Sequence, residues 1–372
     1  MAEVEIGMGK SARRAYGLDE LSIVPSRRTR DPGDVDLTWE IDAFSFSAPI
    51  VGSATDSVIS PATAIELGRL GGVGVLDLEG LWTRYDDPQP LLDEIAGLPD
   101  DRVTGRMREI YAAPVQPELI GARIKELRKA NVVAAGAVTP QRTEALADTL
   151  VAAELDLLVI RGTVVSAEHV TRQEEPLNLK TFVRRLDIPV IVGGCASYQA
   201  ALHLMRTGAA GILVGVGSGL ASTTREVLGL GAPLATAIAD AVGARMRHLD
   251  ETGVYVHLVA DGGLCTGGDI AKAVALGADA VALGASLATA SEAPGQGWHW
   301  GPSAYHPTLP RSSRLRVGTQ GTLEEILTGP ATEGDGRRNL LGALRRSMAM
   351  CGYRSLKELQ KAEVVVASGH GR

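Results

Sequence analysis

The sequence predicts an α/β fold, a single (β/α)8 barrel, on three observations. Eight short, almost continuously apolar runs occur along the chain, at residues 49–54, 72–78, 132–138, 155–162, 188–194, 210–216, 255–263 and 278–286. Such runs are typical of parallel strands whose outer face is covered. Amphipathic segments with apolar residues three and four positions apart lie between them. The spacing of these β-α units, mostly about twenty to thirty residues, favours a TIM barrel.

An open, doubly wound sheet is the alternative architecture. An open sheet would need fewer than the eight strands that the sequence predicts. It would also need a glycine fingerprint near the first strand, and the sequence has none there. A weak internal repeat supports the barrel, because in RLGGVGV, RTGAAGILV and ALGADAVAL a helix ends at a glycine and a strand follows at once. We therefore expect Gly71, Gly208 and Gly277 to adopt the left-handed conformation that ends a helix.

The expected domain organisation is one barrel over residues 1–372, with an N-terminal extension. Residues 81–131, after the second strand, form a charged helical insertion suited to a cover or a subunit contact. Residues 295–339, after the eighth strand, form a flap, because the loops at strand carboxyl ends surround the active site of this fold. Conspicuous rings in the flap predict either an aromatic lid over a planar base or an ordinary packed loop; they are Trp298, His299, Trp300 and His306.

Composition excludes several classes of function. The chain has 372 residues, a formal net charge of -7 and 3 cysteines outside any CxxC or zinc-type cluster, so neither a disulfide framework nor a structural metal site is expected. The mild acidity argues against nucleic acid as a partner. No signal peptide opens the sequence, and five glycines break the longest uncharged stretch, residues 207–224. We expect a cytoplasmic protein with no membrane partner.

Candidate site residues follow the later strands, where barrel enzymes place their chemistry. Three glycines alternate over residues 215–219, and such a loop offers amides to a phosphate or carbonyls to a cation, unless it is a plain tight turn. The last two runs end in Asp-Gly-Gly (261–263) and Gly-Ala-Ser (284–286), where this fold usually binds phosphate. Asp261 would accept hydrogen bonds from ribose hydroxyls or, alternatively, cap the next helix.

At these positions the sequence resembles the IMP dehydrogenase and GMP reductase family. The resemblance covers most of the chain, through GLDELSIVPS (17–26), APIVGSATDSV (48–58), VGVGSGLASTTREVLGLGAP (214–233), ADGGLCTGGDIAKAVALGADAVALGASLATASEAPG (260–295) and GALRRSMAMCGYRSLKELQKAEVVV (342–366). Several such motifs together are very specific to this family.

The resemblance implies a purine nucleoside monophosphate (IMP, GMP or XMP) as ligand and NAD or NADP as cofactor. It assigns Asp261 to the ribose and the residues that follow the last two strands to the phosphate. The full nucleotide set that it implies is Ser53, Thr55, Gly217, Gly219, Asp261, Gly262, Gly263, Gly284 and Ser286. It also implies a monovalent cation such as K+ at Gly217, Gly219 and Ser222, and a homotetramer.

The sequence departs from the family at the reacting position. Ser222 stands where the family has the cysteine whose thiolate adds to C2 of the purine ring, and a serine without a strong base is a poor nucleophile at neutral pH. Thr224 and Glu292 match the pair that assists proton transfer in GMP reductases. We therefore expect Ser222, Thr224 and Glu292 at the catalytic position, with the covalent mechanism in question.

Two further departures lie on the cofactor side. Arg161 replaces a family Asp and would bind a cofactor phosphate, either the 2′-phosphate of NADP or the pyrophosphate, unless it is a surface arginine without a ligand. Cys195 replaces a family Asn and is either a displaced nucleophile or a small residue in an altered pocket. The regulatory tandem domain of most IMP dehydrogenases is missing, and the flap has no Arg-Tyr pair suited to activating water.

Three functions remain open on the sequence. The first is a purine nucleotide oxidoreductase that interconverts nucleotides at C2, closer to GMP reductase than to IMP oxidation. The second is a degenerate barrel that binds a purine monophosphate for regulation and catalyses nothing, which Ser222 favours. The third keeps the phosphate-binding loops for another ribonucleotide or a phosphosugar.

Overall fold

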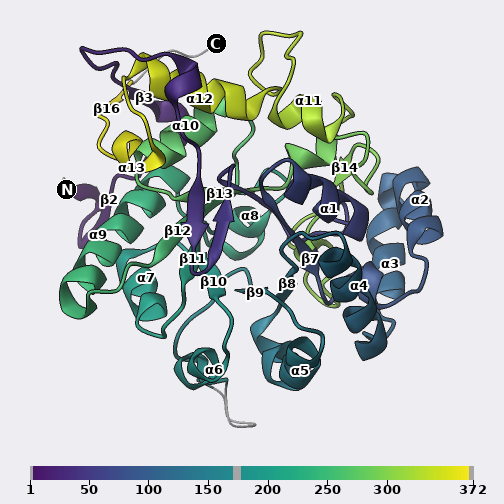
Figure 1. Cartoon of the computed structure of the whole chain (residues 1–372). Helices are drawn as coiled ribbons and strands as arrows, with labels where there is room; N and C mark the ends of the chain where they lie inside the picture. Colours follow the sequence, from purple (N-terminus) through teal and green to yellow (C-terminus); the bar gives the residue numbers. More distant parts are fainter. Residues whose placement is uncertain (1–2, 171–176, 368–372) are drawn as a thin grey trace.

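Eight parallel strands close into a barrel in the computed structural model, which describes residues 3–170 and 177–367 (Figure 1). Each predicted run contains one strand: β6 (Ile50–Gly52), β7 (Val73–Asp77), β8 (Ala135–Val138), β9 (Leu157–Arg161), β10 (Val190–Cys195), β11 (Gly211–Val214), β12 (His257–Asp261) and β13 (Ala280–Leu283). The barrel closes where β13 pairs with β6, at Leu283 and Gly52. The predicted (β/α)8 barrel is confirmed, and the open sheet is excluded.

Eight helices form the outer layer of the described chain. They are α1 (Pro61–Arg69), α4 (Pro117–Lys129), α5 (Pro140–Ala152), α6 (Leu179–Arg185), α7 (Tyr198–Met205), α9 (Leu234–Thr252), α10 (Gly267–Ala275) and α12 (Leu340–Met350). The helix ends follow the predicted repeat, because φ is +90° at Gly71, +96° at Gly208 and +115° at Gly277. A side chain would be strained at these angles, so the three glycines let the chain turn back into the next strand.

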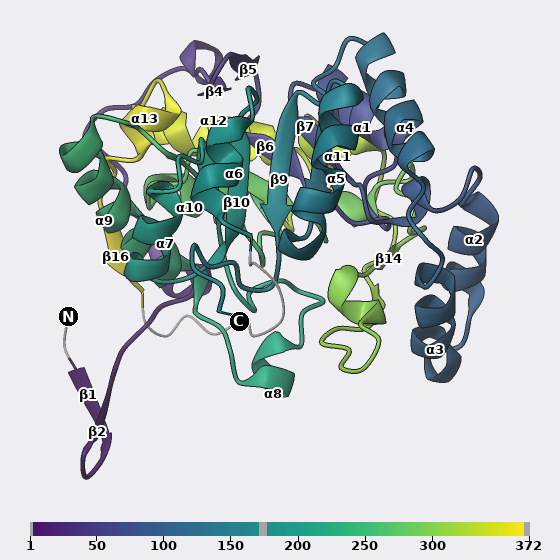
Figure 2. The same ribbon diagram turned by 90° about the horizontal axis from the view of Figure 1, so that it is seen from below.

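The amino end of the barrel is closed by a hairpin of β4 (Trp39–Ile41) and β5 (Phe44–Phe46). Trp39 stacks on Phe46 and donates its indole N–H to His257, the first residue of β12. Another two-stranded sheet pairs β3 (Leu21–Ile23) with β16 (Val364–Val366). A second hairpin, β1 (Glu3–Gly7) with β2 (Lys10–Arg13), extends away from the body in Figure 2. None of the described helices has the length and apolarity to cross a bilayer.

Residues 81–131 contain two additional helices and one helix of the barrel itself. After the short η3 (Leu81–Thr83) come α2 (Gln89–Gly97) and α3 (Asp100–Tyr111), which lie outside the helix layer (Figure 2). The third helix, α4, packs between α1 and α5. It is therefore the ordinary connection between β7 and β8, and the additional structure of this segment is α2 and α3.

The flap packs against these additional helices. It contains β14 (Trp298–His299), η5 (Pro302–Tyr305) and β15 (Leu315–Arg316), and α11 (Leu323–Leu327) follows. A second hydrophobic cluster, separate from the barrel core, joins the two segments, and its buried members are Leu81, Leu92, Ile95, Val103, Met107, Ile110, Tyr111, Trp300 and Ala304. The flap is thus a packed wall of the barrel mouth.

Two polar contacts fix the flap on the insertion. The Tyr111 ring stacks on Tyr305 at 3.5 Å between centroids, and its hydroxyl accepts the indole N–H of Trp300 at 3.1 Å. Arg314 donates to carbonyls at the end of α2, including Ala96 at 3.0 Å and Leu98 at 2.7 Å. A cation beside the unsatisfied carbonyls of a helix carboxyl end is favourable.

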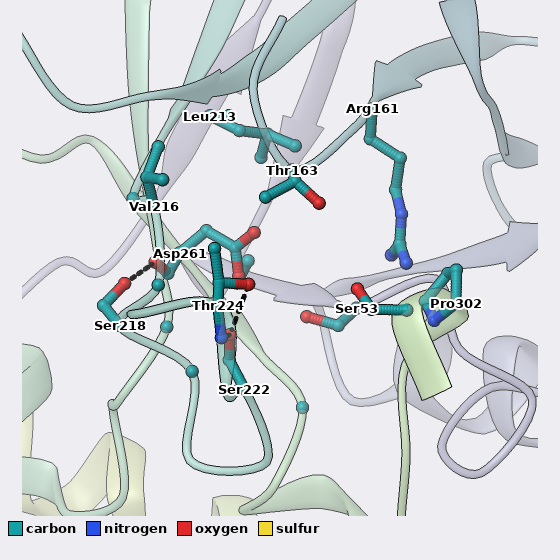
Figure 3. Close-up of a pocket in the computed structure, with 18 of the residues that line it drawn as sticks. Ser53, Arg161, Thr163, Leu213, Val216, Ser218, Ser222, Thr224, Asp261 and Pro302 are labelled. Atoms are coloured by element: carbon teal, nitrogen blue, oxygen red, sulfur yellow. Dashed lines mark hydrogen bonds between the residues drawn. The ribbon is translucent and has the colours of Figure 1, made fainter. Parts of the chain in front are cut away.

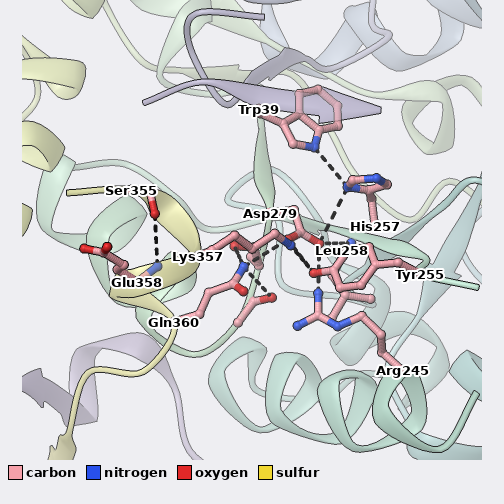
Figure 4. A network of polar contacts seen from close by, with 12 residues as sticks. Trp39, Arg245, Tyr255, His257, Leu258, Asp279, Ser355, Lys357, Glu358 and Gln360 are labelled. Carbon is pink, nitrogen blue, oxygen red and sulfur yellow. Dashed lines mark hydrogen bonds and ion pairs between the residues drawn. The ribbon is translucent and has the colours of Figure 1, made fainter. Parts of the chain in front are cut away.

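A buried carboxylate, Asp279, joins four segments at the other end of the barrel (Figure 4). It accepts hydrogen bonds from Arg245 of α9, Tyr255 and the amide of Leu258, each at 2.8 Å. Lys357 and Gln360, from α13 (Leu356–Leu359) and the residue after it, bind its second oxygen. Burial alone would raise the pKa of Asp279, but the two cations hold it below its ordinary value.

We expect Asp279→Asn to lower the free energy of unfolding by about 3 to 5 kcal/mol at pH 7, because it leaves the Arg245 charge buried without its partner. Urea unfolding measures the change, and Asp250→Asn, at an exposed position on the Arg245 helix α9, is the control. The pKa is lowered in the folded state, so its stabilisation is present at neutral pH and lost below about pH 4. Equal stability of the two variants would contradict the role of Asp279.

We expect Arg314→Met to loosen the flap, because the backbone carbonyls at the end of α2 lose their donor at about 1 to 3 kcal/mol. Hydrogen exchange of the flap amides should rise about tenfold or more in this variant. Arg316→Met is the control, since Arg316 lies two residues further on, in β15, and is exposed. Equal hydrogen-exchange rates of the flap amides in the two variants would show that the hydrogen bonds of Arg314 do not hold the flap.

Candidate functional site

A cavity of about 690 Å³ opens at the carboxyl ends of the barrel strands (Figure 3). Loops after β6, β8, β9, β11, β12 and β13 line it together with the flap. The predicted site residues that line it are Ser53, Thr55, Arg161, Gly217, Gly219, Ser222, Thr224, Asp261, Gly262, Gly263 and Gly284. Residues from six separate loops therefore meet in one pocket, as the barrel topology led us to expect.

The loops after β11 and β12 lie in direct contact, and glycine permits it. A Cβ on Gly215 would lie 1.9 Å from the carbonyl oxygen of Asp261, and one on Gly262 would lie 2.4 Å from Ser218 Oγ. Ser218 in turn donates its hydroxyl to the Asp261 carbonyl at 3.0 Å. This contact fixes the backbone of Asp261, whose carboxyl group lines the pocket. Burial raises the pKa of Asp261, against the opposing effect of Arg161.

Ser222 has a hydroxyl partner but no base. Its Oγ donates to Thr224 Oγ1 at 3.0 Å and accepts the Thr224 amide at 3.3 Å. No carboxylate or imidazole of the described chain hydrogen-bonds to it. The loop is also joined to the flap, because Thr223 donates its amide to the Arg311 carbonyl at 2.7 Å. The hydroxyl is thus well placed to bind a ligand and poorly equipped to attack one.

Arg161 brings a cation into the pocket without a direct partner. It ends β9, and Figure 3 shows its guanidinium pointing toward Ser53 and Pro302. Within residues 3–170 and 177–367 it forms no hydrogen bond or ion pair, although its charge lowers the pKa values of both Asp77 and Asp261 against the effect of burial. An unpaired guanidinium in a pocket is suited to bind an anionic group.

Three predicted site residues do not line the pocket, and their contacts give the physical reasons. Cys195 is 1% exposed and its thiol donates to the Leu213 carbonyl, so it does not line the pocket, and burial raises its pKa to about 12. The Ser286 hydroxyl donates a hydrogen bond to the Leu264 carbonyl at 2.8 Å. Glu292 is exposed and accepts the Leu323 amide at the start of α11, so it does not meet Thr224.

The sequence left an aromatic lid and a packed loop open for the flap, and its two tryptophans do not line the pocket. Trp300 is 1% exposed in the second cluster, and the Arg314 guanidinium lies 3.6 Å from the ring centroid of Trp298. His299 and His306 do line the pocket.

Sequence reasoning missed several pocket residues, among them Thr163 and Arg311. Arg311 donates to Thr163 Oγ1 at 3.2 Å, so the flap also touches the loop after β9. Thr163 lies two residues after Arg161, and this proximity was the one available signal.

The proteins that this chain resembles point to one family. The family model described as IMP dehydrogenase / GMP reductase domain matches residues 15–306. An uncharacterized oxidoreductase of Mycobacterium tuberculosis H37Rv is 53% identical over 372 residues, covering 98% of this chain and 99% of that protein. The inosine-5′-monophosphate dehydrogenase of Escherichia coli K12 is 34% identical over 490 residues, covering 98% and 96%. The longer alignment fits a short form without the tandem domain.

Structural similarity agrees with the sequence matches. The crystal structure of an IMP dehydrogenase/GMP reductase-like protein from Corynebacterium glutamicum superposes with a TM-score of 0.93 at 45% identity, covering 98% of this chain and 97% of that one. With the match over residues 15–306, this chain belongs to the IMP dehydrogenase / GMP reductase family.

Proposed function

We propose that this protein binds a purine nucleoside monophosphate (IMP, GMP or XMP) and, with NAD or NADP, acts as an oxidoreductase at C2 of the purine ring. The observation that carries the proposal is the meeting of Asp261 with the glycines after β11, β12 and β13 in one pocket. Glycines there leave backbone amides open to a phosphate, and Asp261 can accept hydrogen bonds from ribose hydroxyls. Family membership supports the same ligand class.

The other side of the pocket fits a nicotinamide dinucleotide. Arg161, Thr163 and Arg311 line it beside Thr139 and Gln141, so two guanidinium groups face a space large enough for a cofactor. In this proposal Arg161 and Arg311 bind the cofactor phosphates, and the nicotinamide, when bound, accepts or supplies a hydride. Cys195 has no part in it, because its thiol is buried.

A monovalent cation and a homotetramer complete the proposal. Carbonyls of Gly217, Gly219 and Ser222 would hold the cation, although Gly219 already accepts the Ser222 amide at 3.0 Å. Exposed apolar side chains on the β1–β2 hairpin support an assembly, because Val4, Ile6 and Met8 are between 50% and 106% exposed.

A second candidate function is a purine-nucleotide-binding barrel with a regulatory role and no catalysis. The observation that favours it is the hydrogen bond from Ser222 to Thr224, with no carboxylate or imidazole of the described residues bonded to this serine. Glu292, on which the GMP reductase direction depended, binds Leu323 instead. The oxidoreductase proposal therefore leaves the direction of the reaction open.

Turnover and binding separate these two functions. We expect the purified protein to bind GMP, IMP or XMP by calorimetry, and to change NADH or NADPH absorbance with GMP or to reduce NAD with IMP. Ser222→Cys should raise turnover by at least about tenfold, because a thiol ionises far more readily than a hydroxyl. Ala221→Cys, one position away, is the control for a thiol in the same loop. Tight binding without turnover in wild type and Ser222→Cys would favour the regulatory function.

We expect Arg161→Gln to raise the KM for NADPH by about tenfold and that for NADH by less, because a charge-assisted hydrogen bond to the 2′-phosphate is lost. Steady-state kinetics with both cofactors make the measurement. Arg184→Gln, exposed on α6, should change neither value. An equal rise for the two cofactors would remove the 2′-phosphate role and leave Arg161 to the pyrophosphate.

A further inference from the structure

His299 lies at the floor of the pocket, against the backbone after β13. Its imidazole lines the cavity and is 9% exposed. A Cβ placed on Gly284 would lie 3.1 Å from Cε1 and 3.2 Å from Nε2 of this ring, and 3.6 Å from the Cβ of Ser53. The ring therefore packs where glycine leaves room for it, and its Nε2 edge faces the Gly284 and Ser53 side of the pocket.

The hydrogen bonds of Ser57 indicate which nitrogen of His299 carries the proton. Ser57 Oγ has one proton, and it donates to the Trp300 carbonyl at 3.0 Å, an atom that can only accept. The same oxygen accepts the Trp300 amide at 3.2 Å and lies 3.1 Å from His299 Nδ1 and 3.3 Å from Thr55 Oγ1. We assign the Ser57 proton to the Trp300 carbonyl, because that atom can only accept. Nδ1 of His299 then donates its own proton to Ser57, and Nε2 keeps a free lone pair.

The imidazole is also neutral. Burial, with a smaller contribution from the Arg161 charge, lowers the pKa of His299 to about 4. No residue of the described chain donates a hydrogen bond to Nε2. His299 therefore presents an unoccupied acceptor to the pocket at neutral pH.

A second histidine of the pocket, His306, has the opposite tautomer to His299. His306 Nδ1 accepts the amides of Thr308 at 3.3 Å and Leu309 at 3.0 Å. Its Nδ1 is unprotonated, so the proton of the neutral ring is on Nε2. One pocket thus contains an imidazole that accepts through Nε2 and another that donates through it.

We propose that His299 is a ligand-facing hydrogen-bond acceptor and that it binds a ribose hydroxyl of the nucleotide, with Ser57 as the positioning residue that fixes its tautomer. This inference rests on the proposed function. Nε2 lies beside Gly284 and Ser53, on the side of the pocket proposed for phosphate and ribose. A phosphate dianion offers only acceptors, whereas a ribose hydroxyl offers the donor that a bare Nε2 requires.

Nitrogen-15 NMR of histidine-labelled protein tests the tautomer without any ligand. At pH 7 we expect His299 as the Nδ1–H form and His306 as the Nε2–H form, so His306 serves as an internal control. Ser57→Ala should abolish the preference at His299 and leave His306 unchanged, because it removes the acceptor of Nδ1–H. A protonated Nε2 on His299 in the wild type would overturn the inference.

Calorimetry tests the ligand contact through a double-mutant cycle between protein and nucleotide. Wild type, His299→Phe and His299→Gln are each titrated with GMP and with its 2′-deoxy and 3′-deoxy analogues. We expect His299→Phe to weaken GMP binding about five- to tenfold, and one deoxy analogue to lose the same factor with wild type but nothing more with the Phe variant. His299→Gln, which keeps an acceptor near Nε2, should bind GMP more tightly than His299→Phe.

The outcomes separate this inference from the proposed function. Equal losses of all three ligands with His299→Phe would overturn the ribose contact while nucleotide binding stands. Failure of the wild type to bind any nucleotide, with a bare Nε2 in the NMR spectrum, would overturn the nucleotide as ligand and with it both proposals. A spectral shift of His299 Nε2 on addition of GMP, absent for His306, would support the contact directly.

Discussion

The anchoring of the flap on α2 and α3 is the constraint on which the pocket depends. Arg314 holds the carboxyl end of α2, and Tyr111 binds the Trp300 indole, so the flap strand cannot shift without breaking buried contacts. Trp300 in turn shares Ser57 with His299. The orientation of an imidazole in the pocket therefore depends on two helices outside the barrel, which gives the charged insertion a structural role in the site.

Charge in the pocket is balanced by groups that lie behind it. Burial raises the pKa of Asp56 to about 7 and that of Asp77 to about 6, and the Arg161 charge opposes the shift at Asp77. Tyr111 donates its hydroxyl to Asp56, so the residue that anchors the flap also satisfies part of this buried carboxyl pair. An anion that binds Arg161 would compete with carboxylates whose ionisation depends on the same guanidinium, and ligand binding should therefore be coupled to proton uptake.

Sequence periodicity was sufficient for the barrel, because its strands and the three turning glycines are local features. It failed where a side chain's surroundings come from distant segments. The pairing register of β10 with β11 shifts between Gly193 and Cys195. The alternation of side chains along β10 therefore could not predict which way the Cys195 side chain points. Glu292 binds Leu323, and His299 depends on Ser57, a residue 242 positions away. Neither partner leaves a trace in the local sequence.

The serine at position 222 changes what the remaining groups must do. A thiolate route needs a nucleophile of low pKa, whereas Ser222 is held by another hydroxyl and can only donate or accept hydrogen bonds there. The residues proposed to bind the nucleotide nevertheless line the same pocket as Ser222. Any chemistry at the purine ring would then depend on positioning and on a neutral acceptor, and not on covalent attack by residue 222. His299 is the group proposed here as that acceptor, and the contact between the flap and the first barrel loop holds it in the pocket.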